Sequence, residues 1–230
     1  MTAGAGAPER AALDRFPGRA QAGADIVRVC RRLYQRGLVA GPDGNVSVRL
    51  AADRILVTGA GLSKGELTTD DLVEMRLDGT VLAGGRAPST EARMHLRIYE
   101  ARPDVGAVVH AHPPTATGFA VAGEDLMAPV LPEIILQLGG VPRLPFVAPG
   151  GEALAGAVAS AMRTHDAVLL ANHGATTAGR SLLVAHQRME SVEHAARILL
   201  TARLLGRVDE LTPEQRRALA AWPGAAAAAP

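Results

Sequence analysis

Three histidines and one glutamate in this chain have the residue types and spacing of a metal centre. His110 and His112 close an apolar run, residues 105–109, and two prolines follow, which end a strand because proline has no amide to donate. Side chains alternate along a strand, so both imidazoles point the same way and can hold one ion. His173 ends a second apolar run, D-A-V-L-L-A-N-H-G, and is the best candidate for the third ligand of a catalytic zinc site. Glu91 adds a carboxylate at the start of an expected helix.

Each of these features has a simpler explanation when taken alone. A His-x-His pair at the end of a strand is more often two polar residues on an exposed face, and glutamate is common in the first turn of a helix. The second histidine-terminated run and the helix-start glutamate together favour the metal centre.

The helix that carries Glu91 is expected to open at Pro88 and Ser89, with Ser89 as its N-cap. Thr90 and Glu91 then lie in the first turn, where free amides and the helix dipole favour negative charge, so a phosphate could dock there. The apolar stripe of this helix consists of Met94, Ile98 and Ala101.

Periodicity and turn residues predict the remaining elements. Further helices are expected at about residues 22–36, in a short segment ending at Gly123, at about 150–162, at about 181–205 and from Thr212. Strands are expected at about 45–50, 54–58, 73–77, 80–83 and 166–171, the third and fourth joined by an Asp78-Gly79 hairpin. Residues 126–147 are expected to alternate turns with extended pieces, whose prolines suit the edge of a sheet.

A glycine-rich loop, T-G-A-G-L-S-K-G-E, follows the strand at 54–58. It is a poor dinucleotide fingerprint, because its spacing is off by one and no long periodic helix follows. Its exposed amides and one ammonium would suit a single phosphate or carboxylate, and an ordinary mobile turn is the alternative. Lys64 in this loop is the only lysine in the chain, so Schiff-base chemistry would have no other amine to use.

His186, Glu190 and His194 follow one stripe of the expected long helix. They could form a second metal site, but no strand-end partner accompanies them. A solvated stripe or a contact between subunits is therefore the favoured interpretation.

Composition limits the class of protein. The formal net charge of +1 gives no basic field for nucleic acid or an anionic membrane, and no apolar stretch approaches the roughly 20 residues that span a bilayer. The single cysteine, Cys30, lies on an apolar helical face, which fits a reducing cytoplasm. We expect a flexible leader at residues 1–20 without a secretory signal, a single domain at 21–222 and a flexible tail at 223–230.

Four motifs, in order, carry a resemblance to a known family: G-N-V-S-V-R, P-S-T-E-A-R-M-H, V-V-H-A-H-P and L-A-N-H-G, followed by a long helix. Over about residues 22 to 205 the chain resembles the class II aldolase/adducin family, in particular its L-fuculose-phosphate aldolase branch. The resemblance implies an α/β fold, a three-layer α/β/α domain around a mostly antiparallel sheet. It also implies a homotetramer with active sites at the subunit interfaces.

The resemblance assigns roles to individual residues. It implies that His110, His112 and His173 bind zinc, with Fe²⁺, Mn²⁺ and Co²⁺ as alternatives. Glu91 would be the acid/base and would also ligate the metal until substrate displaces it. The implied phosphate pocket consists of Gly44, Asn45, Gly61, Ser89 and Thr90, with Lys64 as a further candidate. Two positions depart from the fuculose enzyme, because Ala60 offers no hydroxyl and Glu133 replaces the tyrosine that protonates the aldehyde.

The resulting hypothesis is a zinc-dependent aldolase that cleaves a ketose 1-phosphate to dihydroxyacetone phosphate and a short aldehyde. Its only partners would be this small phosphorylated sugar and other copies of the chain. Related alternatives are a sugar-phosphate 4-epimerase, a decarboxylase of sugar-acid phosphates and an iron-dependent oxygenase. A noncatalytic adducin-like scaffold is the non-enzyme alternative, which the complete set of metal ligands disfavours.

Overall fold

An eight-stranded sheet forms the centre of the protein, as a computed structural model describes it for residues 11–222. The strands lie in the order β4-β3-β2-β1-β5-β8-β7-β6, and every neighbouring pair is antiparallel except β6 and β7. Their bounds are β1 Asn45–Ala51, β2 Arg54–Thr58, β3 Leu72–Arg76, β4 Val81–Ala83, β5 Ala107–Ala111, β6 Arg143–Leu144, β7 Ala167–Leu170 and β8 Gly174–Gly179. The mostly antiparallel sheet is therefore confirmed.

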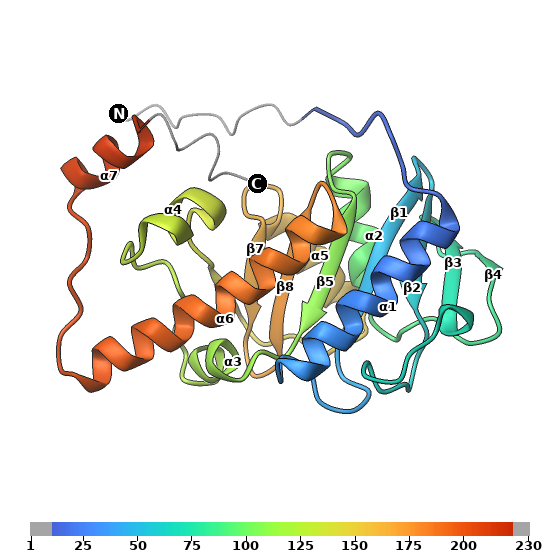
Figure 1. Cartoon of the computed structure of the whole chain (residues 1–230), viewed down its shortest axis with the longest axis horizontal. Helices are drawn as coiled ribbons and strands as arrows, with labels where there is room; N and C mark the ends of the chain where they lie inside the picture. The colour runs from blue at the N-terminus through green and yellow to red at the C-terminus, as the bar shows by residue number, and fades with distance from the viewer. Residues whose placement is uncertain (1–10, 223–230) are drawn as a thin grey trace.

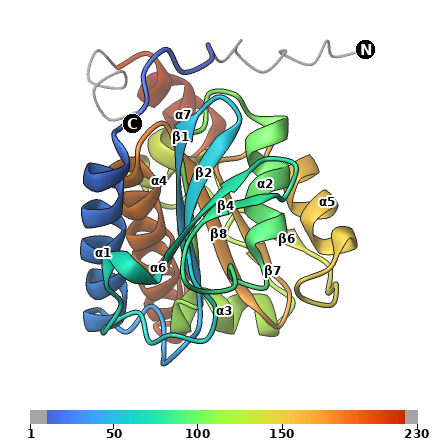
Figure 2. The same cartoon turned by 90° about the vertical axis from the view of Figure 1, so that its right-hand side faces the viewer.

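Helices cover both faces of this sheet, which gives three layers (Figure 2). One face carries α1 (Arg19–Gln35) and α6 (Leu182–Leu204), and the other carries α2 (Ala92–Ala101) and α5 (Glu152–Ala161). A separate apolar core fills each interface between helices and sheet. The shorter helices α3 (Pro114–Val121) and α4 (Pro132–Leu138) contact α6, and α3 also contacts β7 and β8. Helix α7 (Pro213–Ala220) follows α6 after a long connecting segment (Figure 1).

Helix ends follow the capping residues of the sequence. Gly37 adopts a φ of +67° directly after α1, and Gly206 adopts +92° after α6, as helix-terminating glycines do. The Ser181 hydroxyl accepts a hydrogen bond from the Val184 amide at the start of α6. The capping box at Thr212 and Gln215 is present at the start of α7.

Three predicted features were wrong. Strand β8, G-A-T-T-A-G, was not expected at all, and residues 132–138 form the helix α4 rather than an extended piece. Helix α2 begins at Ala92, so Glu91 is its N-cap residue rather than a member of its first turn. A separate turn precedes the helix, in which the amides of Glu91 and Ala92 donate to the Ser89 hydroxyl and carbonyl.

Part of the expected leader contacts the domain. The Leu13 amide donates to the Pro103 carbonyl, and Arg180 donates to the Ala11 carbonyl. Residues 1–10 of the expected leader and the expected tail at 223–230 lie outside the described residues. Within the described part of the chain, no helix has the length and apolar character needed to cross a membrane.

Candidate metal centre

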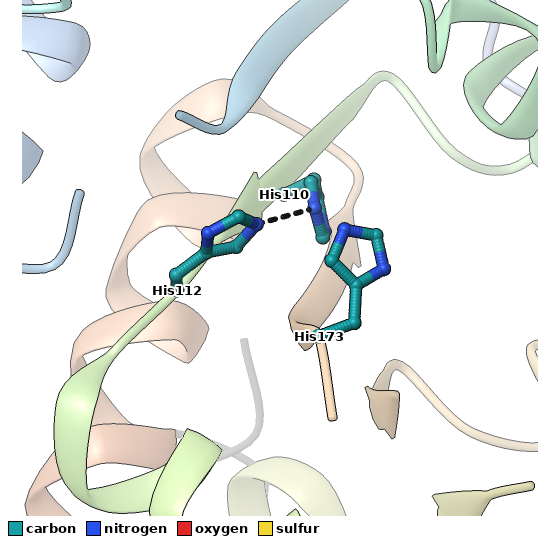
Figure 3. A group of neighbouring side chains, drawn as sticks. All are labelled: His110, His112 and His173. Atoms are coloured by element: carbon teal, nitrogen blue, oxygen red, sulfur yellow. Dashed lines mark hydrogen bonds between the residues drawn. The ribbon is translucent and has the colours of Figure 1, made fainter. Parts of the chain in front are cut away.

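Two strand ends bring the three histidines together (Figure 3). His110 lies in β5, fully buried, with Asn45 of β1 and Thr176 of β8 as its neighbours across the sheet. His112 follows the end of β5, and His173 lies in the turn between β7 and β8, directly after Asn172, which has a φ of +55°. The expected convergence of two strand ends is therefore present.

The distances suit one ion. One ring nitrogen from each of His110, His112 and His173 can be chosen so that all lie within 4.8 Å of one another. The Nε2 atoms of His110 and His112 are 3.2 Å apart. Two ligand nitrogens of a tetrahedral zinc ion lie about 3.3 Å apart, given Zn–N bonds of about 2.0–2.1 Å. The spacing of His110 and His112 therefore suits a divalent metal such as zinc, and His173 lies close enough to be a third ligand after a small movement.

The backbone of β8 fixes the orientation of the central ligand. His110 Nδ1 lies 2.9 Å from the Ala175 carbonyl oxygen and 3.1 Å from the Thr176 hydroxyl. A carbonyl only accepts, so Nδ1 carries a proton, and Nε2 is the ring nitrogen that faces the cluster. His112 Nδ1 lies 3.5 Å from a carboxylate oxygen of Asp43. The rings of His110 and His112 are thus each held by a contact at Nδ1.

Glu91 lies beside these ligands. Its Oε2 accepts a hydrogen bond of 3.0 Å from the Asn45 amide and is 3.3 Å from His110 Nε2, while its Oε1 is 3.2 Å from His173 Nε2. Burial raises the pKa of Glu91, but the hydrogen bond and charge of His110, with the charge of His173 and the Asn45 amide, outweigh it and lower the pKa to about 2. The carboxylate is therefore ionised at neutral pH.

Burial also favours the neutral form of His112 and of His173. It is the main cause that lowers the pKa of His173 to about 4, with the charge of His110 adding to it. The pKa of His112 is lowered for the same two reasons. A metal binds the neutral imidazole, so these ligands need not lose a proton at neutral pH.

A hollow of about 230 Å³ opens next to Glu91, and we call it the Ser89 hollow. Its lining includes Glu91, His112 and every residue expected in the phosphate pocket: Gly44, Asn45, Gly61, Ser89, Thr90 and Lys64. Gly44 has a φ of +73°, and a Cβ there would lie 2.7 Å from the His110 carbonyl oxygen, so only glycine fits.

Lys64 does not present a free ammonium to this hollow. Its side chain is 2% exposed, and Nζ donates to the carbonyls of Pro42 and Leu62 at 2.9 Å each. Burial lowers the pKa of Lys64, against the opposing influence of Cys30 and Asp43. The ammonium therefore holds two loops of the hollow together.

Comparison with known proteins identifies the family. Residues 24–200 match the class II aldolase and adducin N-terminal domain. The chain belongs to the class II aldolase/adducin family. The 3-oxo-tetronate 4-phosphate decarboxylase of Haemophilus influenzae is 34% identical over 180 residues, which are 76% of this chain and 85% of that protein. The L-fuculose phosphate aldolase of Methanocaldococcus jannaschii is 34% identical over 175 residues, 76% and 93% of the two chains.

Solved structures agree with this assignment. An L-fuculose 1-phosphate aldolase superimposes with a TM-score of 0.83 at 30% identity, covering 91% of this chain and 98% of that one. The expected three-layer class II aldolase fold is thereby confirmed.

In this member of the class II aldolase/adducin family, two further groups of residues lie elsewhere than the sequence predicted. His186 is buried at 1% exposure, so the prediction of a solvated stripe was wrong for this residue. Its Nε2 lies 3.5 Å from a carboxylate oxygen of Glu190, which also pairs with Arg36. His194 is exposed, and the three side chains do not form a metal-ligand group among the described residues. Glu133, the residue at the expected tyrosine position, is exposed in the first turn of α4 and does not line the Ser89 hollow.

Sequence reasoning missed two contributors to the site. Asp43 contacts His112, and its place in G-P-D-G-N, just before Asn45, was the available indication. The Ala175 carbonyl that orients His110 belongs to the unexpected strand β8, so nothing in the sequence pattern pointed to it.

Proposed function

We propose that this family member is a metal-dependent lyase that cleaves a carbon–carbon bond in a small phosphorylated sugar. In the form we favour, a ketose 1-phosphate is split between C3 and C4 into dihydroxyacetone phosphate and a short aldehyde. The observation that carries the proposal is the position of Glu91, whose carboxylate contacts two of the three histidines and also lines the Ser89 hollow. A reacting group placed there meets a metal site, a carboxylate and a phosphate pocket at once.

His110, His112 and His173 would hold the ion, with Glu91 as a further ligand before substrate enters. Bound zinc would act as a Lewis acid that stabilises the negative charge developing as the carbon–carbon bond breaks. Ferrous, manganous and cobaltous ions suit the same imidazoles and remain alternatives.

The protein side chains would bind the phosphate and move the proton. Ser89 and Thr90 can donate hydroxyl hydrogen bonds, and the backbone at Gly44 and Gly61 lets a phosphate approach closely. Asn45 holds Oε2 of Glu91, so the carboxylate is fixed in the position from which it exchanges a proton with the substrate carbon.

Decarboxylation of a 3-oxo sugar-acid phosphate is the second candidate. Retro-aldol cleavage needs a group that takes the hydroxyl proton from the departing fragment, whereas carbon dioxide leaves without one. The chain has only two tyrosines, of which Tyr99 is buried against Ser47 and Tyr34 is exposed on α1, and neither lines the Ser89 hollow. That observation, with the decarboxylase named among the relatives, supports this alternative.

We also propose a cytoplasmic homotetramer. The buried free thiol of Cys30 suits a reducing compartment. Large apolar side chains are exposed at the end of α6 and after α7, including Leu204 at 79%, Leu205 at 83% and Trp222 at 54%. Burial of these side chains between copies would remove them from water.

A substrate panel tests the proposal. Purified protein would be assayed with ketose 1-phosphates for dihydroxyacetone phosphate and with a 3-oxo-tetronate 4-phosphate for carbon dioxide, with bound metal measured on the same sample. We expect one of the two products, its loss with EDTA and its return with zinc. Glu91→Gln should abolish turnover while Glu100→Gln, on an exposed position of the same helix, should not. Activity unaffected by both EDTA and Glu91→Gln would defeat the proposal, and oxygen consumption with ferrous iron would replace it with an oxygenase.

A further inference from the structure

Three alternate residues of β1 contact three residues along α2. The β1 side chains point to the α2 face of the sheet, whereas Val46 and Val48 between them belong to the core on the opposite face. Residues four apart on α2 share one face, because an α-helix turns once in about 3.6 residues. We call these buried residues the polar ladder: Asn45, Ser47 and Arg49 of β1, with Glu91 at the start of α2 and His95 and Tyr99 within it.

Hydrogen bonds form the rungs of the polar ladder. The first rung is the 3.0 Å bond from β1 to the Glu91 carboxylate. The Ser47 hydroxyl lies 2.7 Å from His95 Nδ1 and 2.9 Å from the Tyr99 hydroxyl, so it joins two residues of the helix. Arg49 donates to the Tyr99 carbonyl, and its guanidinium carbon lies 4.9 Å from the centre of the Tyr99 ring. The contacts therefore continue from Glu91 to Tyr99.

The spacing of the rungs fixes the helix along the strand. Four residues of an α-helix rise about 6 Å, and two residues of an antiparallel strand rise about 6.8 Å. All rungs can form together only when α2 lies at one height along β1, and a shift of the helix would leave buried polar groups unpaired. Strand β1 is in turn paired with β5, with Asn45 opposite His110. The polar ladder thus sets the height of Glu91 relative to the histidine cluster.

Stability alone does not explain these polar side chains. His95 Nε2 and Arg49 Nε are buried without a hydrogen-bond partner among the described residues. The core around them is apolar, and apolar side chains of similar size would avoid the cost of the unpaired groups. Buried polar groups can instead specify one alignment of two elements, because any other alignment leaves them unsatisfied.

We propose that Ser47 and Tyr99 are positioning residues, which hold α2 at the height along β1 that brings the Glu91 carboxylate to the histidine cluster. The contacts at stake join Glu91 Oε2 to His110 Nε2 at 3.3 Å and Oε1 to His173 Nε2 at 3.2 Å. Neither Ser47 nor Tyr99 lines the Ser89 hollow, so they act on the substrate only through Glu91. The inference rests on the proposed function, in which Glu91 ligates the metal and moves the proton.

Two variants remove one hydroxyl each from the polar ladder: Ser47→Ala and Tyr99→Phe. Thr177→Val is the matched control, because it removes one buried hydroxyl that donates to the Ala185 carbonyl on the α6 face of the sheet. Zinc affinity would be measured by competition with a chelator, with and without the additional substitution Glu91→Ala. Thermal unfolding and steady-state kinetics would be measured on the same proteins.

We expect Ser47→Ala and Tyr99→Phe to weaken zinc binding about threefold to tenfold when Glu91 is present and less than about twofold in Glu91→Ala, where the contact is already lost. A loss of this size is visible by competition but too small to change the metal content of purified protein. The value of kcat should fall about threefold to thirtyfold with KM within about twofold, because the residues of the Ser89 hollow are untouched. Thr177→Val should lower the unfolding midpoint similarly and leave zinc affinity and kcat unchanged.

Coupling to Glu91 separates this inference from the proposed function. If zinc affinity shows the coupling but no sugar phosphate turns over, the positioning role stands and the proposed lyase falls. Zinc affinity unchanged in both ladder variants, or a loss that persists in full in Glu91→Ala, would overturn the inference even if the lyase is active. Absence of zinc binding to the wild type would defeat both. If Ser47→Ala is too unstable to assay, Tyr99→Phe alone decides.

Discussion

Asn45 is the residue on which the position of Glu91 depends. Its amide donates to Oε2 of Glu91 within the buried interior, opposite His110 on the neighbouring strand. The same residue lines the Ser89 hollow, so it could act either on the carboxylate or on the substrate phosphate. Kinetics can separate the two roles.

We predict that Asn45→Ala lowers kcat about tenfold to a hundredfold, because a carboxylate that is free to rotate leaves its reactive geometry for much of the time. Metal content should stay unchanged, since Asn45 contacts no histidine nitrogen directly. Steady-state kinetics and metal analysis of the variant provide the measurement. A rise in KM at constant kcat would instead assign Asn45 to phosphate binding.

His95 gives the protein a pH-dependent stability. It is fully buried, its Nδ1 lies 2.7 Å from the Ser47 hydroxyl, and burial, followed by the charge of His110, lowers its pKa to about 3. The unfolded chain binds a proton at His95 below about pH 6.5 while the folded chain does not. The contribution of His95 to the free energy of unfolding is therefore fully present above about pH 6.5 and is lost as the pH falls toward its folded-state pKa of about 3.

We predict that His95 makes the free energy of unfolding fall by up to about 1.4 kcal/mol per pH unit below pH 6. Urea titrations at pH 7, 6 and 5, in EDTA, would measure this slope in the wild type and in His95→Gln. The variant should be less stable at pH 7 but should show a shallower dependence on pH. Parallel pH profiles in the two proteins would remove His95 as the cause.

The clustering of the three histidines was predictable at this scale, and the contacts that support their rings were not. Alternation along one strand places His110 and His112 on the same side, so a short sequence segment contains that information. The Ala175 carbonyl and the burial of Lys64 depend on chain segments that meet only in the folded protein. Side-chain type alone suggested a free ammonium at Lys64, whereas packing directed it to two carbonyls.

At the scale of elements, α3 is held by a carboxylate from a distant helix. Glu193 of α6 is 3% exposed and accepts from the amides of Thr115 and Ala116, the first residues after Pro114. Helix α3 begins two residues after His112, so this cap also fixes the chain leaving the metal centre. Glu193 pairs in addition with the exposed Arg197.

We predict that Glu193→Ala lowers the free energy of unfolding by about 2–3 kcal/mol, because it leaves two amides at the start of α3 without their acceptor. Arg197→Ala is the matched control, since it removes only a partly exposed ion pair worth about 0–1 kcal/mol. Chemical denaturation monitored by circular dichroism would give both values. Equal effects of the two substitutions would show that the ion pair, not the cap, is what matters.

Strand β8 shows why one element escaped prediction. Its residues, G-A-T-T-A-G, include only two β-branched side chains and two glycines, so propensity favours a loop. A Cβ at Gly174 would lie 2.5 Å from the Ala111 carbonyl oxygen, and one at Gly179 would lie 2.7 Å from the Ala185 amide nitrogen. Close packing against β5 and α6 requires small residues here, and that requirement is invisible in the sequence of the strand alone.

For the whole molecule, the local elements were largely predictable and their arrangement was not. The helical and hairpin signals of α1, α6 and the β3–β4 pair are local, and the structure contains them close to the expected bounds. The order β1-β5-β8-β7 brings residues 45, 110 and 176 side by side through pairings between distant segments. Periodicity cannot specify such pairings, and only the family resemblance indicated the three layers.

This topology makes the three-histidine cluster a property of the folded molecule. His110 and His173 lie 63 residues apart in the sequence, so the unfolded chain cannot present the trio at fixed distances. A metal that binds only the folded state adds about 2.7 kcal/mol to the free energy of unfolding when its free concentration is 100 times the dissociation constant.

We predict that zinc raises the unfolding midpoint of the EDTA-treated protein by about 5–10 °C. Differential scanning calorimetry should show this rise in His194→Ala, whose histidine is exposed elsewhere on α6, and lose it in His173→Ala. A zinc-dependent rise that persists in His173→Ala would place the bound ion outside the three-histidine site.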